Sequence, residues 1–472
     1  MSTTLSPITS VNPTTEEVLA RFDPFTPEQT GRALDEAQDA FVAWRDRSIA
    51  DRAVPMRRLA ALLRERADRY GRLITLEMGK PIAEAKAEIE KCAWGAEHYA
   101  ENAARYLADE VIETNAKRSI VAFEPMGIVL AVMPWNFPFW QVIRFAAPAL
   151  MAGNAALLKH ASNVPQCALA IEEALRDAGF PEGLLRTVLL AGSAVEPLID
   201  DPRVRAVTLT GSSDTGSRIA ALAGRALKKS VLELGGSDPF IVLGDADLEQ
   251  AAKVGTRARN QNAGQSCIAA KRFIAVESVA RDFEKRFAAE VEALRVGDPL
   301  DPQTQIGPLA RADLRETLER QVGESVRMGA RVLTGGERGA GKGWYYQPTV
   351  LVDVTEDMPV FKEETFGPVA AVLRVPDAED AVRVANDSSY GLGANLWTRD
   401  LALGERLARR IESGSVFVNG MVASDPRLPF GGVKRSGYGR ELASYGIKEF
   451  VNIQTIWIGP PQQAQPTTPS AE

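Results

Sequence analysis

The segment MGIVLAVMPWNFPFW, residues 126 to 140, decides the fold that the sequence predicts. Its first eight residues are apolar apart from one glycine, and prolines then stand on both sides of Asn136. A short apolar run that ends at a proline is typical of a strand buried on both faces in a parallel sheet. Similar runs alternate with amphipathic segments up to residue 244, which predicts a doubly wound α/β unit with ligands at the carboxyl ends of its strands.

Two alternating units are expected, because the chain of 472 residues is too long for one small core. Strands of the first unit are expected in MGIVLAVM, AALLK, RTVLL, VRAVTLT and VLEL, and a further strand is expected in PFIVLG at 239–244. Its helices, with three that precede it, are expected at 28–50, 56–78, 82–107, 139–152, 163–178, 194–200 and 213–226. In the second unit, which begins after 236, helices are expected at 247–262, 278–294, 311–328, 377–385 and 400–411, and strands at 271–276, 330–333, 369–375 and 415–418.

Two segments outside these units also alternate like strands. They span residues 111–124 and 449–458, and they predict a small β extension that pairs with itself or with another subunit. The last segment, 460–472, has few apolar residues and is expected to be disordered.

Composition and charge exclude several classes of protein. The net charge is −7 and no long basic run is present, so neither nucleic acid nor an anionic membrane is expected as a partner. No apolar run reaches membrane-spanning length, and the N-terminus lacks the features of a secretory signal. The cysteines Cys92, Cys167 and Cys267 and the two histidines show no metal-ligand spacing, so a cytoplasmic protein without a metal site is expected.

Cys267 ends the stretch QNAGQSC, residues 261 to 267, and is a candidate nucleophile. Gly264 and the small or polar neighbours predict a constrained turn, in which a thiol can be partly exposed and reactive. Most free cysteines are small core residues instead. The assignment therefore depends on partners elsewhere in the chain.

Asn136 and Glu233 are the candidate partners. The prolines around Asn136 hold its amide in a set direction, from which it could donate to a developing oxyanion. Capping of the following helix is the alternative. Glu233 is the single acid in the apolar run VLEL, where it is either paired or a general base, because an unpaired buried charge is costly.

Two glycine-containing loops are candidate phosphate sites. TLTGSSDTG at 208–216 leads from a strand through Gly211 and Ser212 into a helix, whose N-terminal amides could bind a phosphate. A capped turn without a ligand is the alternative. GERGAGK at 336–342 matches GxxxxGK, but Gly343 replaces the required Ser or Thr, so a glycine-rich hairpin loop is expected there.

Six motifs together resemble the aldehyde dehydrogenase superfamily. They are PWNFP at 134–138, LTGS at 209–212, ELGG at 233–236, GQSC at 264–267, EETFGPV at 363–369 and PFGGVKRSGYGRE at 429–441. Their order and spacing are similar to those of the family, and the resemblance covers the chain except its C-terminal tail. It implies two doubly wound parallel-sheet domains and a small β oligomerisation extension in a homodimer or homotetramer. The implied cofactor-binding domain covers 1–110 and 125–235, and the catalytic domain covers 236–435.

The resemblance implies an enzyme that oxidises a small-molecule aldehyde with NAD(P). Cys267 would attack the aldehyde carbon, and the Asn136 amide with the Cys267 backbone amide would hold the oxyanion. Glu233 would activate the water that hydrolyses the thioester. The residues that correspond to cofactor-binding positions of the family are Met133, Pro134, Trp135, Lys159, Ser162, Thr210, Gly211, Ser212, Leu234, Glu364 and Phe366.

Ser162 determines the cofactor that we expect. NAD-selective relatives usually have a glutamate three residues after the lysine that corresponds to Lys159, where it repels a 2'-phosphate. The sequence here is KHAS, so a 2'-phosphate can be accommodated beside Lys159. NADP is therefore expected as the preferred cofactor, with NAD also usable.

The chain is also similar to bacterial members of the family that oxidise succinate semialdehyde. Arg144 corresponds to an arginine that faces the far carboxylate of that substrate, with a helix-surface salt bridge as the alternative. A second arginine of some relatives is replaced by Gln261, and Ser424 could add a donor.

Four alternatives stay open. The substrate could be another aldehyde, without a carboxylate. A coenzyme-A-acylating dehydrogenase would keep Cys267 but would not need Glu233. A non-catalytic scaffold would need neither residue, and a cysteine hydrolase would have to pair its thiol with His98 or His160.

Overall fold

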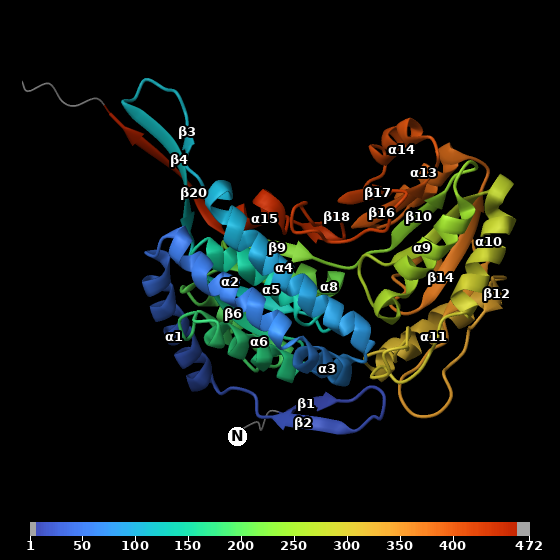
Figure 1. The fold of residues 1–472 in the computed structure, drawn as a ribbon, viewed down its shortest axis with the longest axis horizontal. Helices are drawn as coiled ribbons and strands as arrows, with labels where there is room; N and C mark the ends of the chain where they lie inside the picture. The colour runs from blue at the N-terminus through green and yellow to red at the C-terminus, as the bar shows by residue number, and fades with distance from the viewer. Residues whose placement is uncertain (1–5, 460–472) are drawn as a thin grey trace, which may run out of the picture.

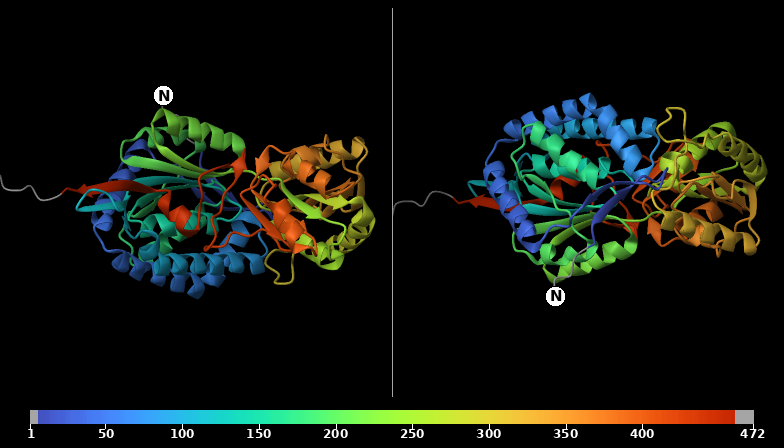
Figure 2. Two further views of the ribbon diagram at one scale, coloured as in Figure 1. Left: turned by 90° about the horizontal axis from the view of Figure 1, so that it is seen from above. Right: turned by 90° about the horizontal axis from the view of Figure 1, so that it is seen from below.

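Two β-sheets, each covered by helices on both faces, form the two lobes of the computed structural model, which describes residues 6–459 (Figure 1, Figure 2). Strand β10 (Asp238–Val242) shows why both faces are covered. Phe240 and Val242 pack into one hydrophobic core and Ile241 into another, because successive side chains of a strand point to opposite faces. The predicted pair of doubly wound units is confirmed.

The first sheet contains the strand that residues 126 to 133 predict. Its strand order is β19-β9-β8-β5-β6-β7. The bounds are β5 (Ile128–Met133), β6 (Ala155–His160), β7 (Leu185–Thr187), β8 (Val204–Thr210), β9 (Lys229–Glu233) and β19 (Gly437–Tyr438). β5 pairs in parallel with β6 on one side and β8 on the other, so the order reverses at β5. Open α/β sheets bind ligands at such a switch point.

Helices from three parts of the chain cover this sheet. Their bounds are α1 (Pro27–Arg45), α2 (Ile49–Glu65), α3 (Ala67–Met78), α4 (Ile82–Tyr106), α5 (Trp140–Met151), α6 (Pro165–Asp177), α7 (Glu196–Asp200), α8 (Ser213–Arg225) and α15 (Ala443–Lys448), with a 3₁₀ turn η1 at Gly192–Ala194.

The expected helices at 28–50 and 56–78 have the wrong boundaries. Ser48 caps a new helix by accepting a hydrogen bond from the backbone N–H of Asp51 (3.1 Å). The helix that starts there runs through Pro55, which lies inside α2 rather than before it. The predicted boundary followed the apolar periodicity, which continues on both sides of Ser48. The capping hydrogen bond of Ser48 instead determines where α2 begins.

The second sheet has the order β12-β13-β14-β11-β10-β16-β17. Its other strands are β11 (Ala270–Val276), β12 (Arg331–Thr334), β13 (Thr349–Val352), β14 (Val369–Val375), β16 (Gly393–Trp397) and β17 (Ser415–Val418). The helices are α9 (Leu248–Asn260), α10 (Glu277–Glu292), α11 (Ala312–Arg327), α12 (Pro359–Lys362), α13 (Ala378–Asn386) and α14 (Leu401–Ala408).

Each of the two predicted parallel sheets also has one antiparallel strand at its edge. β12 is antiparallel to β13 and β19 is antiparallel to β9. The loop that contains GERGAGK joins β12 to β13, and Arg338 forms an antiparallel bridge with Tyr346. A hairpin connects antiparallel strands, so the predicted glycine-rich hairpin loop is confirmed.

The short apolar runs of β13 and β16 were not expected as strands, nor were four other short strands. These are the N-terminal hairpin of β1 (Ile8–Val11) with β2 (Val18–Phe22), and the pair β15 (Tyr390–Gly391) with β18 (Val433–Lys434). Two to five residues are too few for a periodic pattern to be distinguished from a loop.

The β extension projects from the first lobe (Figure 1). β4 (Arg118–Pro125) pairs in antiparallel register with β20 (Val451–Ile458), and β3 (Glu110–Val111) adds a short third strand. The two predicted segments therefore pair with each other, although the first begins later than expected.

The chain crosses between the sheets twice. It passes to the second sheet between Glu233 and Asp238, and it returns between Val418 and Gly437. The boundaries at 235 and 435 stay predictions, and the tail at 460–472 lies outside the described residues. Within residues 6–459, none of the helices combines the length and apolarity that crossing a membrane requires.

Candidate active site

A cavity of about 230 Å³ lies beyond the carboxyl ends of β5 and β8. The predicted site residues that line it are Pro134, Trp135, Asn136, Thr210, Gly211, Ser212, Leu234, Cys267, Glu364 and Phe366. The lining residues that sequence reasoning missed are Gln141, Gly235, Arg311 and Leu314. The switch point thus brings the candidate nucleophile, the candidate oxyanion donor and most of the candidate cofactor residues together.

The turn that presents Cys267 has an unusual backbone conformation. Asn262, Ala263 and Gly264 are consecutively left-handed, with φ of 56°, 51° and 73°. This region costs a non-glycine residue about 1 kcal/mol or more, so surrounding contacts must hold the turn. The buried Arg259 is one such contact, because its Nη2 donates to the carbonyl oxygen of Gly264 (2.6 Å). The structure confirms the constrained turn that the sequence predicts.

Hydrogen bonds fix both ends of the Asn136 amide. Its Nδ2 donates to the carbonyl oxygen of Gln265 (3.0 Å), and its Oδ1 accepts from Nε2 of Gln141 (3.0 Å). Its own carbonyl oxygen accepts from Nδ2 of Asn262 (2.8 Å), so the amide is tied to the nucleophile turn. The second N–H of Nδ2 has no acceptor in the part of the chain that is described, and the residue lines the cavity. An oxyanion donor requires this preorganised arrangement.

The Cys267 thiol is protonated in this state of the protein. Burial raises its pKa to about 12, and the carboxylates of Glu364 and Glu233 act in the same direction. The cations of Arg144 and Lys271 oppose the rise. To act as a nucleophile, this thiol would need added positive charge or a base.

Neither histidine serves the thiol. The ring Nε2 of His160 lies 2.9 Å from the carbonyl oxygen of Pro138, and burial lowers its pKa to about 4. His98 contacts the hydroxyl of Tyr106 (3.1 Å). Neither ring hydrogen-bonds Cys267 within residues 6–459, so the arrangement does not favour a histidine-dependent cysteine hydrolase.

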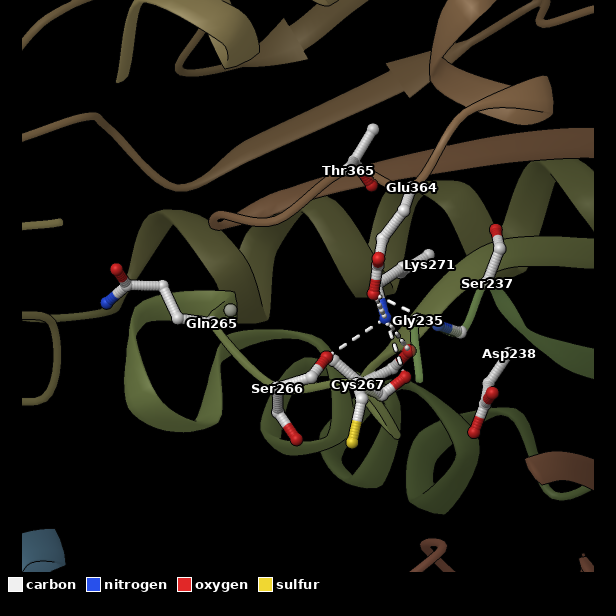
Figure 3. A network of polar contacts seen from close by, with 12 residues as sticks. Gly235, Ser237, Asp238, Gln265, Ser266, Cys267, Lys271, Glu364 and Thr365 are labelled. Atoms are coloured by element: carbon white, nitrogen blue, oxygen red, sulfur yellow. Dashed lines mark hydrogen bonds and ion pairs between the residues drawn. The ribbon is translucent and has the colours of Figure 1, made fainter. Parts of the chain in front are cut away.

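Lys271 is a fully buried cation next to the backbone of Cys267 (Figure 3). Its Nζ donates to the carbonyl oxygens of Ser266 (2.9 Å) and Cys267 (2.8 Å) and lies 3.5 Å from Oε1 of Glu364. The same Oε1 accepts from the backbone N–H of Gly236 (3.1 Å). The Cys267 sulfur points away from this ammonium, so Lys271 supports the backbone of the nucleophile and couples it to Glu364 (Figure 3). Sequence reasoning missed this residue.

Glu233 lies at the end of β9, only 2% exposed, and it does not line the cavity. Both of its carboxyl oxygens lack a hydrogen-bond partner among the described residues. Burial raises its pKa well above the ordinary value, and the neighbouring Glu441 carboxylate adds to the rise, while Arg144 opposes it. The shift favours the neutral acid, and the group would have to ionise before it could act as a base.

Arg144 lies inside the first lobe, 4% exposed, rather than on a helix surface. Its Nε forms an ion pair with Oε2 of Glu441, and its Cζ lies 4.7 Å from the centre of the Phe430 ring. Its Nη2 is 3.4 Å from the hydroxyl of Thr210. The structure thus has a salt bridge at Arg144, as the alternative expects, but a buried one.

The other two candidate substrate residues lie outside the catalytic cavity. Gln261 lines a second cavity of about 380 Å³. The Ser424 hydroxyl accepts hydrogen bonds from Nζ of Lys91 (2.7 Å) and Nε1 of Trp140 (3.0 Å). These contacts bring Ser424 next to the lining of the same second cavity, to which Lys91 and Trp140 belong.

The remaining candidate cofactor residues lie at the ends of β5 and β6. Met133 is the last residue of β5 and is buried. Lys159 is partly buried, which lowers its pKa, and no carboxylate of the described chain forms an ion pair with it. Ser162 is exposed just beyond β6. None of the three lines the 230 Å³ cavity.

A cysteine on a strained turn, with an oriented amide beside it at the switch point of a doubly wound sheet, is an arrangement suited to an enzyme that forms a covalent thiol adduct. The model of the aldehyde dehydrogenase family matches residues 1–456, and the chain belongs to this family. A probable succinate-semialdehyde dehydrogenase, NADP(+), of Synechocystis sp. is 51% identical over 451 residues, which cover 96% of this chain and 99% of that protein.

Two further relatives have similar names. Succinate-semialdehyde dehydrogenase, NADP(+), 1 of Mycobacterium ulcerans is 50% identical over 457 residues, covering 96% of this chain and all of that protein (100%). The crystal structure of succinic semialdehyde dehydrogenase from Streptococcus pyogenes, in complex with NADP+, superposes with a TM-score of 0.93 at 38% identity. That match covers 96% of this chain and 100% of the other.

Proposed function

We propose that the protein oxidises succinate semialdehyde to the dicarboxylic acid, with NADP as the preferred cofactor and NAD as a usable one. The observation that carries the proposal is the pair of Cys267 and the Asn136 amide in one cavity at the switch point. Full-length relatives at about half identity that are named for this aldehyde and for NADP support the choice of substrate and cofactor.

The residues around the cavity are suited to a nicotinamide dinucleotide. Ser212 caps α8 and leaves the first amides of that helix at the cavity, where a phosphate would bind. A Cβ on Gly211 would meet only Leu209, at 3.5 Å, so packing of the protein does not require glycine there and the backbone is open to a ligand. Glu364 and Phe366 would hold the nicotinamide end, and Lys159 the adenosine end. When bound, the nicotinamide supplies the hydride acceptor.

The chain's own residues account for the remaining chemistry. Cys267 gives its thiol proton to water, and its sulfur forms a bond to the aldehyde carbon. The π bond of the carbonyl breaks in this step, and the free N–H of Asn136 stabilises the oxygen that becomes negative. After oxidation the acyl group stays on Cys267 as a thioester. Glu233, once ionised, takes a proton from water, which adds to the thioester carbonyl and releases the acid and the thiolate.

Ser162→Glu is expected to change the preferred cofactor. The introduced carboxylate would stand three residues after Lys159 and repel a 2'-phosphate. The ratio of kcat/KM with NADP to kcat/KM with NAD should fall by about 10-fold or more, since one such repulsion amounts to more than about 1.4 kcal/mol. Ser162→Gln, which has a similar size without charge, is the control. If both variants lower the ratio equally, charge at this position does not determine the preference.

Two alternative activities are distinguished by the products. An enzyme for uncharged aldehydes would oxidise butanal as efficiently as succinate semialdehyde. A coenzyme-A-acylating enzyme would need coenzyme A for turnover and would leave Glu233 without a role. The buried, unpaired Glu233 favours hydrolysis, because an acid without a function is costly in such a place.

A panel of aldehydes with NADP and NAD tests the proposed function. Formation of reduced nicotinamide is followed by absorbance, with and without coenzyme A. We expect the highest kcat/KM for succinate semialdehyde with NADP, independent of coenzyme A. A kcat/KM for butanal equal to that for succinate semialdehyde would contradict the proposed substrate. Activity that requires coenzyme A would contradict the proposed hydrolysis of the thioester.

We also propose a homodimer or homotetramer in the cytoplasm. The β extension supports association, because large apolar side chains on it are exposed at Val111, Ile453 and Trp457. The buried free thiols of Cys92 and Cys167 are suited to a reducing compartment. Light scattering after size-exclusion chromatography measures the number of subunits. A monomer would contradict the proposed homodimer or homotetramer.

A further inference from the structure

Lys271 on β11 holds the peptide group that contains the backbone N–H of the candidate nucleophile. Its Nζ donates to the carbonyl oxygen of Ser266 (2.9 Å) and to that of Cys267 (2.8 Å). The Ser266 carbonyl and the Cys267 N–H belong to one planar trans peptide group, in which they point in opposite directions. Because the ammonium fixes the carbonyl, it also fixes the Cys267 N–H on the opposite side.

The Cys267 N–H is free to bind a ligand. It donates to no acceptor within residues 6–459, and Cys267 lines the catalytic cavity. The sulfur also points away from the ammonium, so the sulfur and the N–H lie on the same side of the backbone (Figure 3). The free N–H of the Asn136 amide is in the same cavity. An oxygen that becomes negative on a carbon bound to the sulfur therefore has two donors available.

The Lys271 ammonium polarises this peptide group. An ammonium has three donors and no acceptor, and each polar atom that it contacts is an acceptor, including Oε1 of Glu364 at 3.5 Å. Burial lowers the pKa of Lys271, as does the Arg259 cation, while the carboxylates of Glu364 and Asp238 oppose the shift. A cation at the carbonyl oxygen draws electrons from the amide, so the N–H of the same peptide group becomes a stronger donor.

Close packing keeps water away from the ammonium, which is fully buried. A Cβ on Gly236 would come within 2.5 Å of the Cys267 carbonyl oxygen, and one on Gly235 within 2.5 Å of Oε2 of Glu364. These two glycines therefore allow the connection between β9 and β10 to lie directly against that carbonyl and that carboxylate. A charge acts more strongly in such a dry place than in water.

We propose that Lys271 is a positioning residue of the oxyanion site, which orients and polarises the 266–267 peptide group so that the Cys267 N–H stabilises the negative oxygen. The inference rests on the proposed function, in which Cys267 is the nucleophile, and adds the residue that makes the backbone donor effective. Lys271 acts through the backbone and not on the sulfur.

Two reagents that modify Cys267 without a cofactor separate the oxyanion from the thiolate. With p-nitrophenyl acetate, the thiolate adds to the carbonyl carbon and the π electrons move to oxygen. The carbonyl then forms again, p-nitrophenolate leaves, and the acetyl group stays on sulfur. With iodoacetamide, the thiolate displaces iodide from a saturated carbon, so no oxyanion forms. Both reactions use the same thiolate, whose proton goes to water, so the ratio of their rate constants measures stabilisation of the oxyanion.

Lys271→Met is expected to lower the ratio of acetylation to alkylation by about 10-fold or more. Removal of a whole oxyanion donor costs about 100- to 1000-fold, and in this variant the donor stays but loses its support. Release of p-nitrophenolate measures acetylation, and peptide mass spectrometry measures alkylation of Cys267 at the same alkaline pH, with Cys267→Ala as the blank. A residue that only stabilises the thiolate or the fold would affect both reactions equally, and an unchanged ratio would overturn the proposal.

Arg272→Met is the matched control. Arg272 is the next residue of β11 and is also buried, but its Nη1 and Nη2 donate to the carbonyl oxygens of Val384 (3.0 Å) and Ala385 (2.9 Å) on α13. Loss of this cation should leave the ratio unchanged. A decrease as large as that in Lys271→Met would contradict a specific role of Lys271.

A second variant keeps the test decisive if Lys271→Met does not fold. Lys271→Gln keeps a hydrogen-bond donor without the charge and should still lower the ratio, and a wild-type ratio in this variant would overturn the proposal. The assay contains neither an aldehyde nor a cofactor. An error in the proposed substrate would therefore appear in the panel of aldehydes and not in this ratio.

Discussion

Cys267→Ala is expected to lower kcat for aldehyde oxidation by more than about a thousandfold, because no other group of the cavity can form the covalent adduct. Nucleotide binding should persist, since the alanine keeps the backbone that Lys271 supports through the Cys267 carbonyl oxygen (2.8 Å). Steady-state assays measure the first quantity, and titration of protein fluorescence with NADP measures the second.

Cys92→Ala is the matched control for that variant. Cys92 is a buried thiol on α4 whose pKa burial raises well above the ordinary value, so it is not reactive. Activity should be kept in Cys92→Ala and lost in Cys267→Ala. Comparable activity in the two variants would show that Cys267 is not the nucleophile.

Glu233→Gln should separate the two halves of the reaction. A burst of reduced cofactor, one per active site, is expected at a rate close to that of the wild type, because the amide leaves Cys267 and Asn136 unchanged. Hydrolysis of the thioester should then slow by about 100-fold or more, which is the usual contribution of a general base. Stopped-flow absorbance measures both phases, and a steady-state rate equal to that of the wild type would refute the assignment.

The raised pKa of Glu233 adds a pH dependence to this result. Burial and the Glu441 carboxylate raise the pKa of Glu233 above its ordinary value, so this group ionises at a higher pH than an ordinary glutamate. The hydrolysis rate of the wild type should therefore increase as the pH rises through the raised pKa of Glu233, and that of Glu233→Gln should not follow the same titration. The same shift affects stability. The folded state favours the neutral acid, so ionisation of Glu233 as the pH rises lowers the free energy of unfolding.

The parts of the site that the sequence predicts are those where a motif follows directly from a strand. Asn136 follows β5 and Gly211 follows β8, and parallel neighbours necessarily bring these ends together. The reason given for the Asn136 amide is incomplete, however. Its orientation depends on Gln265 and Gln141 as well as on the prolines, and one of these partners is 129 positions away in the chain.

The residues that the sequence does not reveal depend on burial and on contacts between distant segments. Lys91 is one basic residue among several on an amphipathic helix, and the sequence does not show that it donates a hydrogen bond to Ser424, 333 positions away. The sequence contains a weak indication of Lys271, because the apolar run AKRFIAV at 270–276, which forms the buried strand β11, has two basic residues. Arg144 corresponds to a position of the family, but only the structure shows that it forms an ion pair with Glu441.

The central claim is that the aldehyde becomes a thioester on Cys267. Glu233→Gln protein is mixed with succinate semialdehyde and NADP, quenched with acid during the burst, digested and analysed by peptide mass spectrometry. The predicted result is a succinyl group on the peptide that contains Cys267, in an amount equal to the reduced cofactor formed. Reduced cofactor together with an unmodified Cys267 peptide, or an adduct on another residue, would contradict the account.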